Sequence, residues 1–129
     1  MAHTGAVVRA ITETPATPVE HATGATIQVL LGPEDGAGRF VTRHFTIAPG
    51  GRIPRHRHDS IEHEQVVLAG RMVVELDGRT VDVAAGDCLL IPAGVAHSYA
   101  NPGTKPVRFL CVVPRTDGYQ TEWLEAPAE

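Results

Sequence analysis

The sequence has no run of basic residues, few cysteines and no long apolar stretch, and each absence narrows the kind of protein it can be. The formal net charge is −4, so nucleic acid and anionic membranes are poor partners. No apolar run approaches the ~20 residues that cross a membrane, and the N-terminus lacks the pattern of a signal peptide. The only cysteines, Cys88 and Cys111, are too few for a disulfide framework. We therefore expect a reducing, cytoplasmic location.

Several common catalytic signatures are missing as well. The chain has no serine elbow, no glycine-rich phosphate loop and no Cys-x-x-Cys pair. No helical stripe of useful length appears. Short segments rich in β-branched and aromatic residues alternate with turn residues instead, at a spacing of roughly 8–12 residues that is typical of a sandwich or barrel.

The strand pattern gives a specific layout for the chain. Residues 1–23 form a loose leading segment, and the turn residues 49–51 end the second strand. Residues 122–126 predict either one helical turn or a closing strand. Asp77-Gly78 is a two-residue hairpin signal. The predicted strands are 26–31, 39–47, 64–69, 71–76, 79–83, 88–91, 95–100 and 107–113.

What the chain has in excess is histidine. There are seven, and His56, His58 and His63 fall within eight positions. Side chains at i and i+2 of a strand point the same way, so His56 and His58 can bind one metal ion at about 2.0–2.2 Å each. Alone, this pair is more typical of two surface histidines beside arginines than of a metal site. His97 follows the turn residues 92–94, and a hairpin that returns to the same barrel wall would bring it opposite the pair.

These histidines lie in two gapped motifs that resemble the paired motifs of the cupin superfamily. The first spans residues 50–70 and the second residues 86–101, and the fifteen residues between Gly70 and Gly86 match the short bacterial members. The resemblance implies an all-β fold, the double-stranded β-helix or jelly roll, with one domain over residues 1–129. The motif residues are Gly50, His56, His58, Gly70, Gly86, Pro92, Gly94, His97 and Asn101.

Position 63 departs from the family pattern. Six residues before Gly70 the family usually has Glu, and this chain has His63, flanked by Glu62 and Glu64. The family also allows a spacing that would make Glu62 the ligand. We favour His63, because a slip of one residue would turn the apolar partners of this strand outward.

With His63, the site resembles the small cupins that hold manganese on four histidines. The resemblance implies one divalent metal ion per chain on His56, His58, His63 and His97, with manganese or iron favoured and oxidative chemistry. The general ligand preferences of metals agree only partly with manganese, because imidazole suits zinc, copper, iron and nickel while manganese prefers oxygen. Zinc, nickel and copper therefore stay possible.

Strand alternation suggests further pocket residues. Tyr99 shares the phase of His97, and Arg43 lies on the strand that leads to the site. We predict Arg43 or Tyr99 as a contact for a substrate anion and Cys111 as a thiol beside the metal ligands. The alternatives are that Cys111 only fills the barrel and that Arg43 points to solvent. The other histidines have no motif spacing and are interpreted as surface residues: His3, His21 and His44.

Three functions remain open, because one barrel fold hosts many activities. The first is a dioxygenase-like oxidoreductase acting on a small organic substrate. The second is a redox-neutral lyase, isomerase or cyclase, against which the lack of an obvious acidic base in the pocket counts weakly. The third is a binding or sensor module without turnover. The resemblance also implies a homodimer, in which strand 26–31 could extend the partner's sheet.

Overall fold

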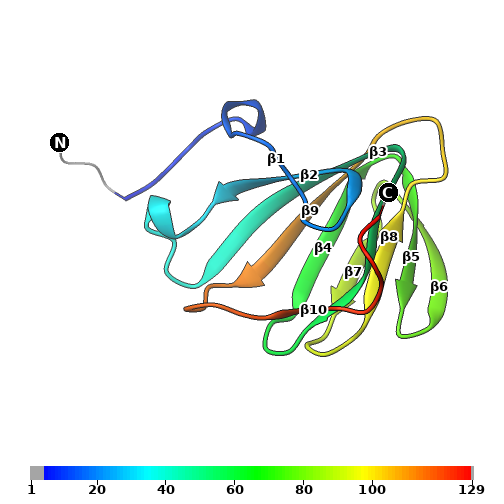
Figure 1. Cartoon of the computed structure of the whole chain (residues 1–129). Helices are drawn as coiled ribbons and strands as arrows, with labels where there is room; N and C mark the ends of the chain where they lie inside the picture. The colour runs from blue at the N-terminus through cyan, green and yellow to red at the C-terminus, as the bar shows by residue number, and fades with distance from the viewer. Residues whose placement is uncertain (1–4, 129) are drawn as a thin grey trace.

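The structure, a computed structural model, describes residues 5–128, and almost all of its regular elements are β-strands (Figure 1). Two short 3-10 turns, Ile11–Glu13 and Pro33–Asp35, are the helical elements among these residues. None of the described residues forms a helix of the length and apolarity needed to span a bilayer. The strands are β1 (Thr17–Pro18), β2 (Thr23–Leu31), β3 (Phe40–His58), β4 (His63–Ala69), β5 (Arg71–Leu76), β6 (Arg79–Ala84), β7 (Cys88–Ile91), β8 (His97–Ala100), β9 (Val107–Pro114) and β10 (Thr121–Trp123).

The long strand β3 belongs to both walls of the barrel. Its first half pairs with β2 and β9, and β9 continues through β4 to β7. Its second half pairs with β8 and β10, and β8 continues through β5 to β6. In Figure 1, β2, β9 and β4 of the first wall lie to the left of β8, β5 and β6 of the second wall. This arrangement confirms the all-β jelly roll.

The prediction that residues 49–51 end a strand is wrong, because β3 runs through them. They form a bulge instead: β2 moves from Ala25 to Thr23 while its partner on β3 moves from Ile47 to Arg52. Gly51 permits the bend, since a Cβ there would lie 2.8 Å from the carbonyl oxygen of Gly24. Bulges of this kind bend a strand and redirect its side chains. The bend carries the histidine-bearing half of β3 into the second wall.

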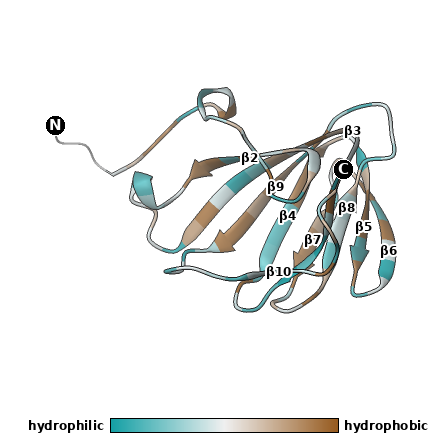
Figure 2. Ribbon diagram, in the orientation of Figure 1, coloured by the Kyte–Doolittle hydropathy of each residue, from teal (hydrophilic) through white to brown (hydrophobic). Residues whose placement is uncertain are grey.

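Strict alternation separates an apolar interior from the surface. On β4 and β9 every second residue is buried, and Figure 2 shows hydrophobic and hydrophilic residues alternating along the strands. The interior packs Ile47, Val67, Met72, Val74, Val107 and Phe109, each 0% or 1% exposed. Burial of such side chains is the main stabilising contribution to the barrel.

Three smaller features match the sequence pattern. Asp77 and Gly78 form the predicted two-residue hairpin between β5 and β6, both with positive φ and with Leu76 opposite Arg79. The buried amide of Asn101 donates to the carbonyl oxygens of Ile47 and Lys105, which fixes the end of β8. Of the two alternatives for the C-terminal segment, the structure has the closing strand, as β10.

Candidate metal centre

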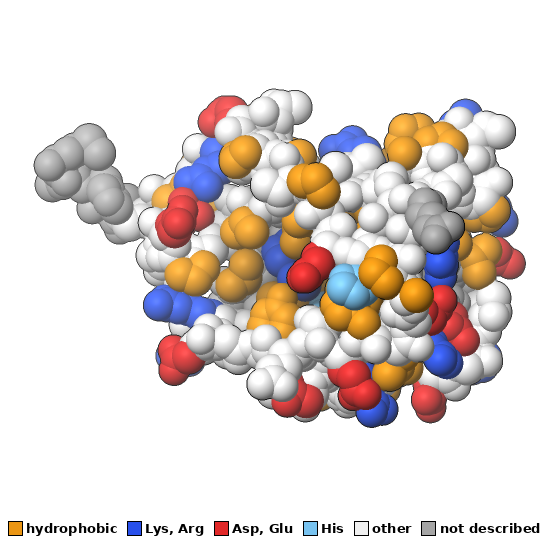
Figure 3. All heavy atoms as spheres, viewed as in Figure 1, with side chains coloured by type: hydrophobic (Ala, Val, Ile, Leu, Met, Phe, Trp, Pro, Cys, Tyr) orange, Lys and Arg blue, Asp and Glu red, His pale blue; other side chains and the backbone are white. Residues whose placement is uncertain are grey.

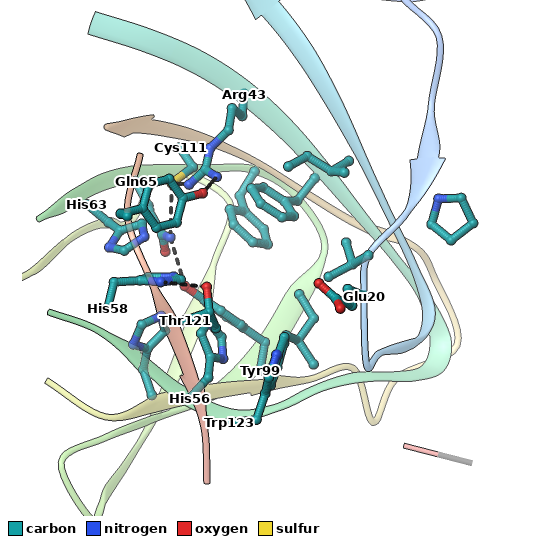
Figure 4. A pocket seen from close by; sticks show the side chains of 18 residues that line it. Glu20, Arg43, His56, His58, His63, Gln65, Tyr99, Cys111, Thr121 and Trp123 are labelled. Carbon is teal, nitrogen blue, oxygen red and sulfur yellow. Dashed lines mark hydrogen bonds between the residues drawn. The ribbon is translucent and has the colours of Figure 1, made fainter. Parts of the chain in front are cut away.

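Four histidines from three strands meet inside the barrel. His56 and His58 share the inner face of β3, His97 begins β8 opposite His56, and His63 begins β4. All four are buried. Figure 4 shows His56, His58 and His63 directed into one cavity. The bulge in β3, the pairing of its second half with β8, and the pairing of its first half with β9, which also pairs with β4, therefore bring together residues that are up to 41 positions apart.

The distances suit a single ion. The candidate ligand atoms of His56, His58 and His97 all lie within 4.8 Å of one another. His63 adjoins this triad, with its ring centroid 4.9 Å from that of His58 and 5.4 Å from that of His97. Glu62 is exposed, as is Glu64, so the structure places His63 and not Glu62 beside the triad. The alternation argument for this position thus agrees with the observed side-chain directions.

Hydrogen bonds fix which ring nitrogens can bind a metal. The Nδ1 atoms of His56 and His97 lie 2.8 and 2.9 Å from the carbonyl oxygens of Pro54 and Val95. A carbonyl only accepts, so each Nδ1 carries the proton and each Nε2 keeps a free lone pair. The Nδ1 of His58 lies 3.0 Å from the hydroxyl of Thr121. Such partners orient ligand histidines in metal sites.

The electrostatics keep these imidazoles neutral. Burial lowers the pKa of His97 to about 3 and, together with the neighbouring His56, lowers the pKa of His58 to about 4. Burial and then the charge of Arg43 push the pKa of His63 far below its ordinary value. Burial also lowers the pKa of His56. Neutral imidazoles are the form that binds a metal ion.

Two polar atoms near the cluster are buried without a hydrogen-bond partner in the described part of the chain. The Nδ1 of His63 and the Oε1 of Gln65 are buried and have no hydrogen-bond partner among the described residues. Buried polar atoms without a partner are rare and costly. A divalent ion bound by the four histidines would give the buried His63 ring a partner, and imidazole nitrogen is a common metal ligand. The residues present therefore fit a metal centre.

The histidines form one wall of an aromatic cavity of about 250 Å³ (Figure 4). The rings of Phe45 and Phe109 stack at 5.0 Å, and Tyr99 lies 5.3 Å from Phe109. Figure 3 shows hydrophobic side chains gathered around the hollow on this face, with acidic and histidine side chains near its edge. A cavity of this size and lining suits part of a flat, largely apolar small molecule.

The three pocket residues that alternation suggested all line this cavity. Arg43 is buried and donates to the hydroxyl of Tyr119 and to the sulfur of Cys111, so the solvent-directed alternative for Arg43 is wrong. Tyr99 accepts a hydrogen bond of 2.8 Å from Gln65. Burial raises the pKa of Tyr99, which keeps the phenol protonated and able to donate. Cys111 is buried in the barrel, and its sulfur accepts hydrogen bonds from Arg43 and Gln65 at 3.2 and 3.4 Å.

The interpretation of the remaining histidines needs a correction. His44 is buried, at 2% exposure, and not on the surface. It lies on the outer face of β3, where its Nδ1 bonds to Gln28 and the leading segment covers it through bonds from Gln28 to Ile11 and Thr14. Sequence spacing could not show this cover, because the segment has no regular pattern. His21 is partly exposed and stacks on Trp123, and His3 lies outside the described residues.

Several cavity residues were not predicted from the sequence, and four of them matter for the site: Glu20, Tyr119, Thr121 and Trp123. Three of them come from the C-terminal segment, which β10 lays across the second half of β3 with Thr121 opposite His58 and Trp123 opposite His56. The closing-strand alternative was the one signal that could have found them. Glu20 is an exposed carboxylate on the loop before β2, and it lines the cavity at its outer side (Figure 4).

Comparison with known proteins gives a consistent assignment. The family model described as "Cupin domain" matches residues 43–113. Polyketide synthase CurC from Streptomyces cyaneus is 37% identical over 88 residues, which cover 67% of this chain and 57% of CurC. Alginate biosynthesis protein AlgA from Pseudomonas aeruginosa is 30% identical over 76 residues, which cover 59% of this chain and 16% of AlgA. The chain therefore matches only part of the length of these two proteins.

A solved structure is similar over nearly the whole chain. The polyketide cyclase RemF from Streptomyces resistomycificus superimposes with a TM-score of 0.83 at 32% sequence identity. The match covers 95% of this chain and 89% of RemF.

Proposed function

Because this chain belongs to the cupin family, we propose that it is a metal-dependent cyclase that closes a ring within a polyketide-type chain. The observation that carries the proposal is an aromatic cavity with four neutral histidines in its wall, in a chain 32% identical to a polyketide cyclase over 95% of its length. The similarity to CurC points to the same class of substrate. A chain of alternating ketones would bring flat, oxygen-bearing segments that suit both the rings and a metal.

The four histidines would hold one divalent ion: His56, His58, His63 and His97. Such an ion supplies Lewis acidity, which polarises a ketone and makes the neighbouring methylene protons more acidic. Ring closure needs no change of oxidation state, so manganese, iron, zinc, nickel or copper would each serve. The role of the protein would be to hold the ligands in their neutral form in the wall of the cavity.

The chain's other residues would position the substrate and move protons. Phe45 and Phe109 provide a flat wall that folds the chain so that a methylene faces a ketone. In the reaction the methylene carbon loses a proton, its electron pair forms the new C–C bond at the ketone carbon, and the ketone oxygen takes up a proton. Loss of water then gives an aromatic ring. The protonated phenol of Tyr99 can donate to that oxygen, and the carboxylate of Glu20 can accept the methylene proton at the cavity edge.

The proposal is tested with a synthetic aryl triketone and metal-loaded protein under nitrogen. We expect a cyclised product that has lost one water, formed at the same rate in air, and no product after removal of the metal by a chelator. A reaction that needs oxygen and consumes it would contradict the proposal.

That contrary result would favour the dioxygenase-like function. A specific observation supports this second candidate: the donor set has four imidazoles and no carboxylate, so the full charge of a bound manganese or iron stays uncompensated. Held by these histidines, a redox-active ion would supply oxidative chemistry to a substrate in the cavity. An oxygen electrode separates the two functions directly.

We also propose that two chains pair through the outer face of β4, β7 and β9. Val66, Leu68 and Leu90 are 39–58% exposed there, and Leu110 lies opposite Val66 in register. The sheet extension by strand 26–31 stays a second prediction for the pairing, because β2 pairs with β3 on one edge and with β1 only at Thr26 and Ile27 on the other. Sedimentation should give the mass of a dimer for the wild type and of a monomer for Leu90→Glu. A wild-type monomer would contradict this pairing.

A further inference from the structure

Arg43 is a buried cation without an anionic partner. It is 9% exposed, in the middle of the first half of β3, with Cys111 opposite it on β9. The three ion pairs among the described residues join other arginines to exposed or partly exposed carboxylates. A buried charge costs several kcal/mol unless it is paired. The barrel therefore holds a positive charge whose usual compensation is missing.

The hydrogen bonds of Arg43 leave some of its N–H groups without an acceptor among the described residues. One terminal nitrogen donates to the hydroxyl of Tyr119 and the other to the sulfur of Cys111, both at 3.2 Å. Each terminal nitrogen carries a second N–H group. The Phe45 ring below the guanidinium, 5.3 Å from its central carbon, adds a cation–π contact but no charge. The guanidinium is thus held in a fixed position by neutral groups, with N–H groups left for a ligand.

This guanidinium and the histidine cluster border the same cavity. In Figure 4, Arg43, Cys111, Gln65 and His63 lie together at one end of the cavity, and Glu20 and Trp123 lie toward another side. A ligand can therefore reach both the guanidinium and the histidines. The exposed Glu20 carboxylate disfavours a second anion at its side, so an anionic group is best placed at the Arg43 end.

We propose that Arg43 forms a carboxylate subsite, so that the substrate is an aromatic or β-keto acid whose carboxylate lies against Arg43 while a ketone oxygen faces the histidines. This inference rests on the proposed function, since it specifies the substrate of that same site. Arginine suits the task, because its planar fork matches a carboxylate and its charge persists at all working pH values. A neutral ketone chain would leave the buried charge uncompensated.

The test uses binding of simple probes. Trp123 lines the cavity and is the single tryptophan of the chain, so its fluorescence reports occupancy. Benzoate and its neutral analogue benzamide are titrated into metal-free and zinc-loaded protein. We expect benzoate to bind wild type about tenfold more tightly than benzamide in both forms, as charge-assisted pairing implies.

Variants locate the effect. Arg43→Gln should lose about tenfold in benzoate affinity and little in benzamide affinity, with Arg43→Lys in between. Arg71→Gln, at an exposed position on β5, should match wild type. Near-ultraviolet circular dichroism checks folding, and Arg43→Lys decides the question if Arg43→Gln does not fold. Equal benzoate affinity in wild type and the Arg43 variants would overturn the subsite. Because no turnover is measured, this result is independent of whether ring closure occurs.

Discussion

At the scale of single residues, the glycine that ends the first motif shows why the motif needs glycine. Gly70 has a φ of +80°, and a Cβ added there would lie 2.5 Å from the carbonyl oxygen of Pro106. The clash involves backbone atoms, which cannot move aside without a cost in free energy. The position connects β4 to β5 and lets the chain pass close to the start of β9. The motif glycine therefore protects the strand order that brings His63 to the site.

We expect Gly70→Ala to lower the free energy of unfolding by roughly 3 kcal/mol, from left-handed strain together with this collision. Gly78→Ala is the matched control, because Gly78 has a similar φ of +83° but a Cβ added there would have no atom of the described residues within 4 Å. It should cost about 1 kcal/mol. Urea unfolding measures both. Equal losses for the two variants would show that strain alone matters and that the contact with Pro106 does not.

At the scale of elements, the C-terminal strand contributes to the candidate metal centre. β10 pairs with the second half of β3, and its Thr121 hydroxyl is the partner of the His58 Nδ1. Removing that partner should free the His58 ring to rotate. We predict that Thr121→Val weakens zinc affinity about 10–100-fold. Competition with a chromophoric chelator measures it, and Thr80→Val on the exposed face of β6 serves as control. Unchanged zinc affinity in Thr121→Val would show that β10 does not orient the His58 ring for metal binding.

Some strands of the fold could be predicted from the sequence, and other elements could not. Strand alternation predicted the inner faces of β4, β8 and β9, because burial on one face of a strand imposes a period of two. It failed at the bulge of β3, where residues that usually end strands instead bend one. It also missed the positions of β10 and of the segment over His44. Those two placements depend on contacts between distant segments, and such contacts leave no local pattern.

At the scale of the whole molecule, the buried histidines couple stability to pH. Their folded-state pKa values lie below the ordinary value of about 6.5, to about 4 for His58 and about 3 for His97. Below pH 6.5 the unfolded chain therefore binds more protons than the folded chain, so stability falls as pH falls. Above pH 6.5 this contribution is fully present.

Urea unfolding of metal-free protein should accordingly show a steady loss of stability from pH 7 to pH 4.5. The loss should be smaller in His63→Leu, which removes one buried titrating group while keeping an apolar side chain. A profile of the same slope in both proteins would mean that other groups, such as His44, control the acid response.

We propose that one divalent ion binds to four histidines in this barrel, and elemental analysis of the purified protein measures that ion. Protein prepared without a histidine tag or chelator is analysed as wild type, His63→Ala and Glu62→Ala. We predict about one ion per chain in wild type and in Glu62→Ala, since Glu62 is exposed, and a large loss in His63→Ala. Full retention in His63→Ala with loss in Glu62→Ala, or no metal in any of the three proteins, would show that the four histidines do not bind the ion.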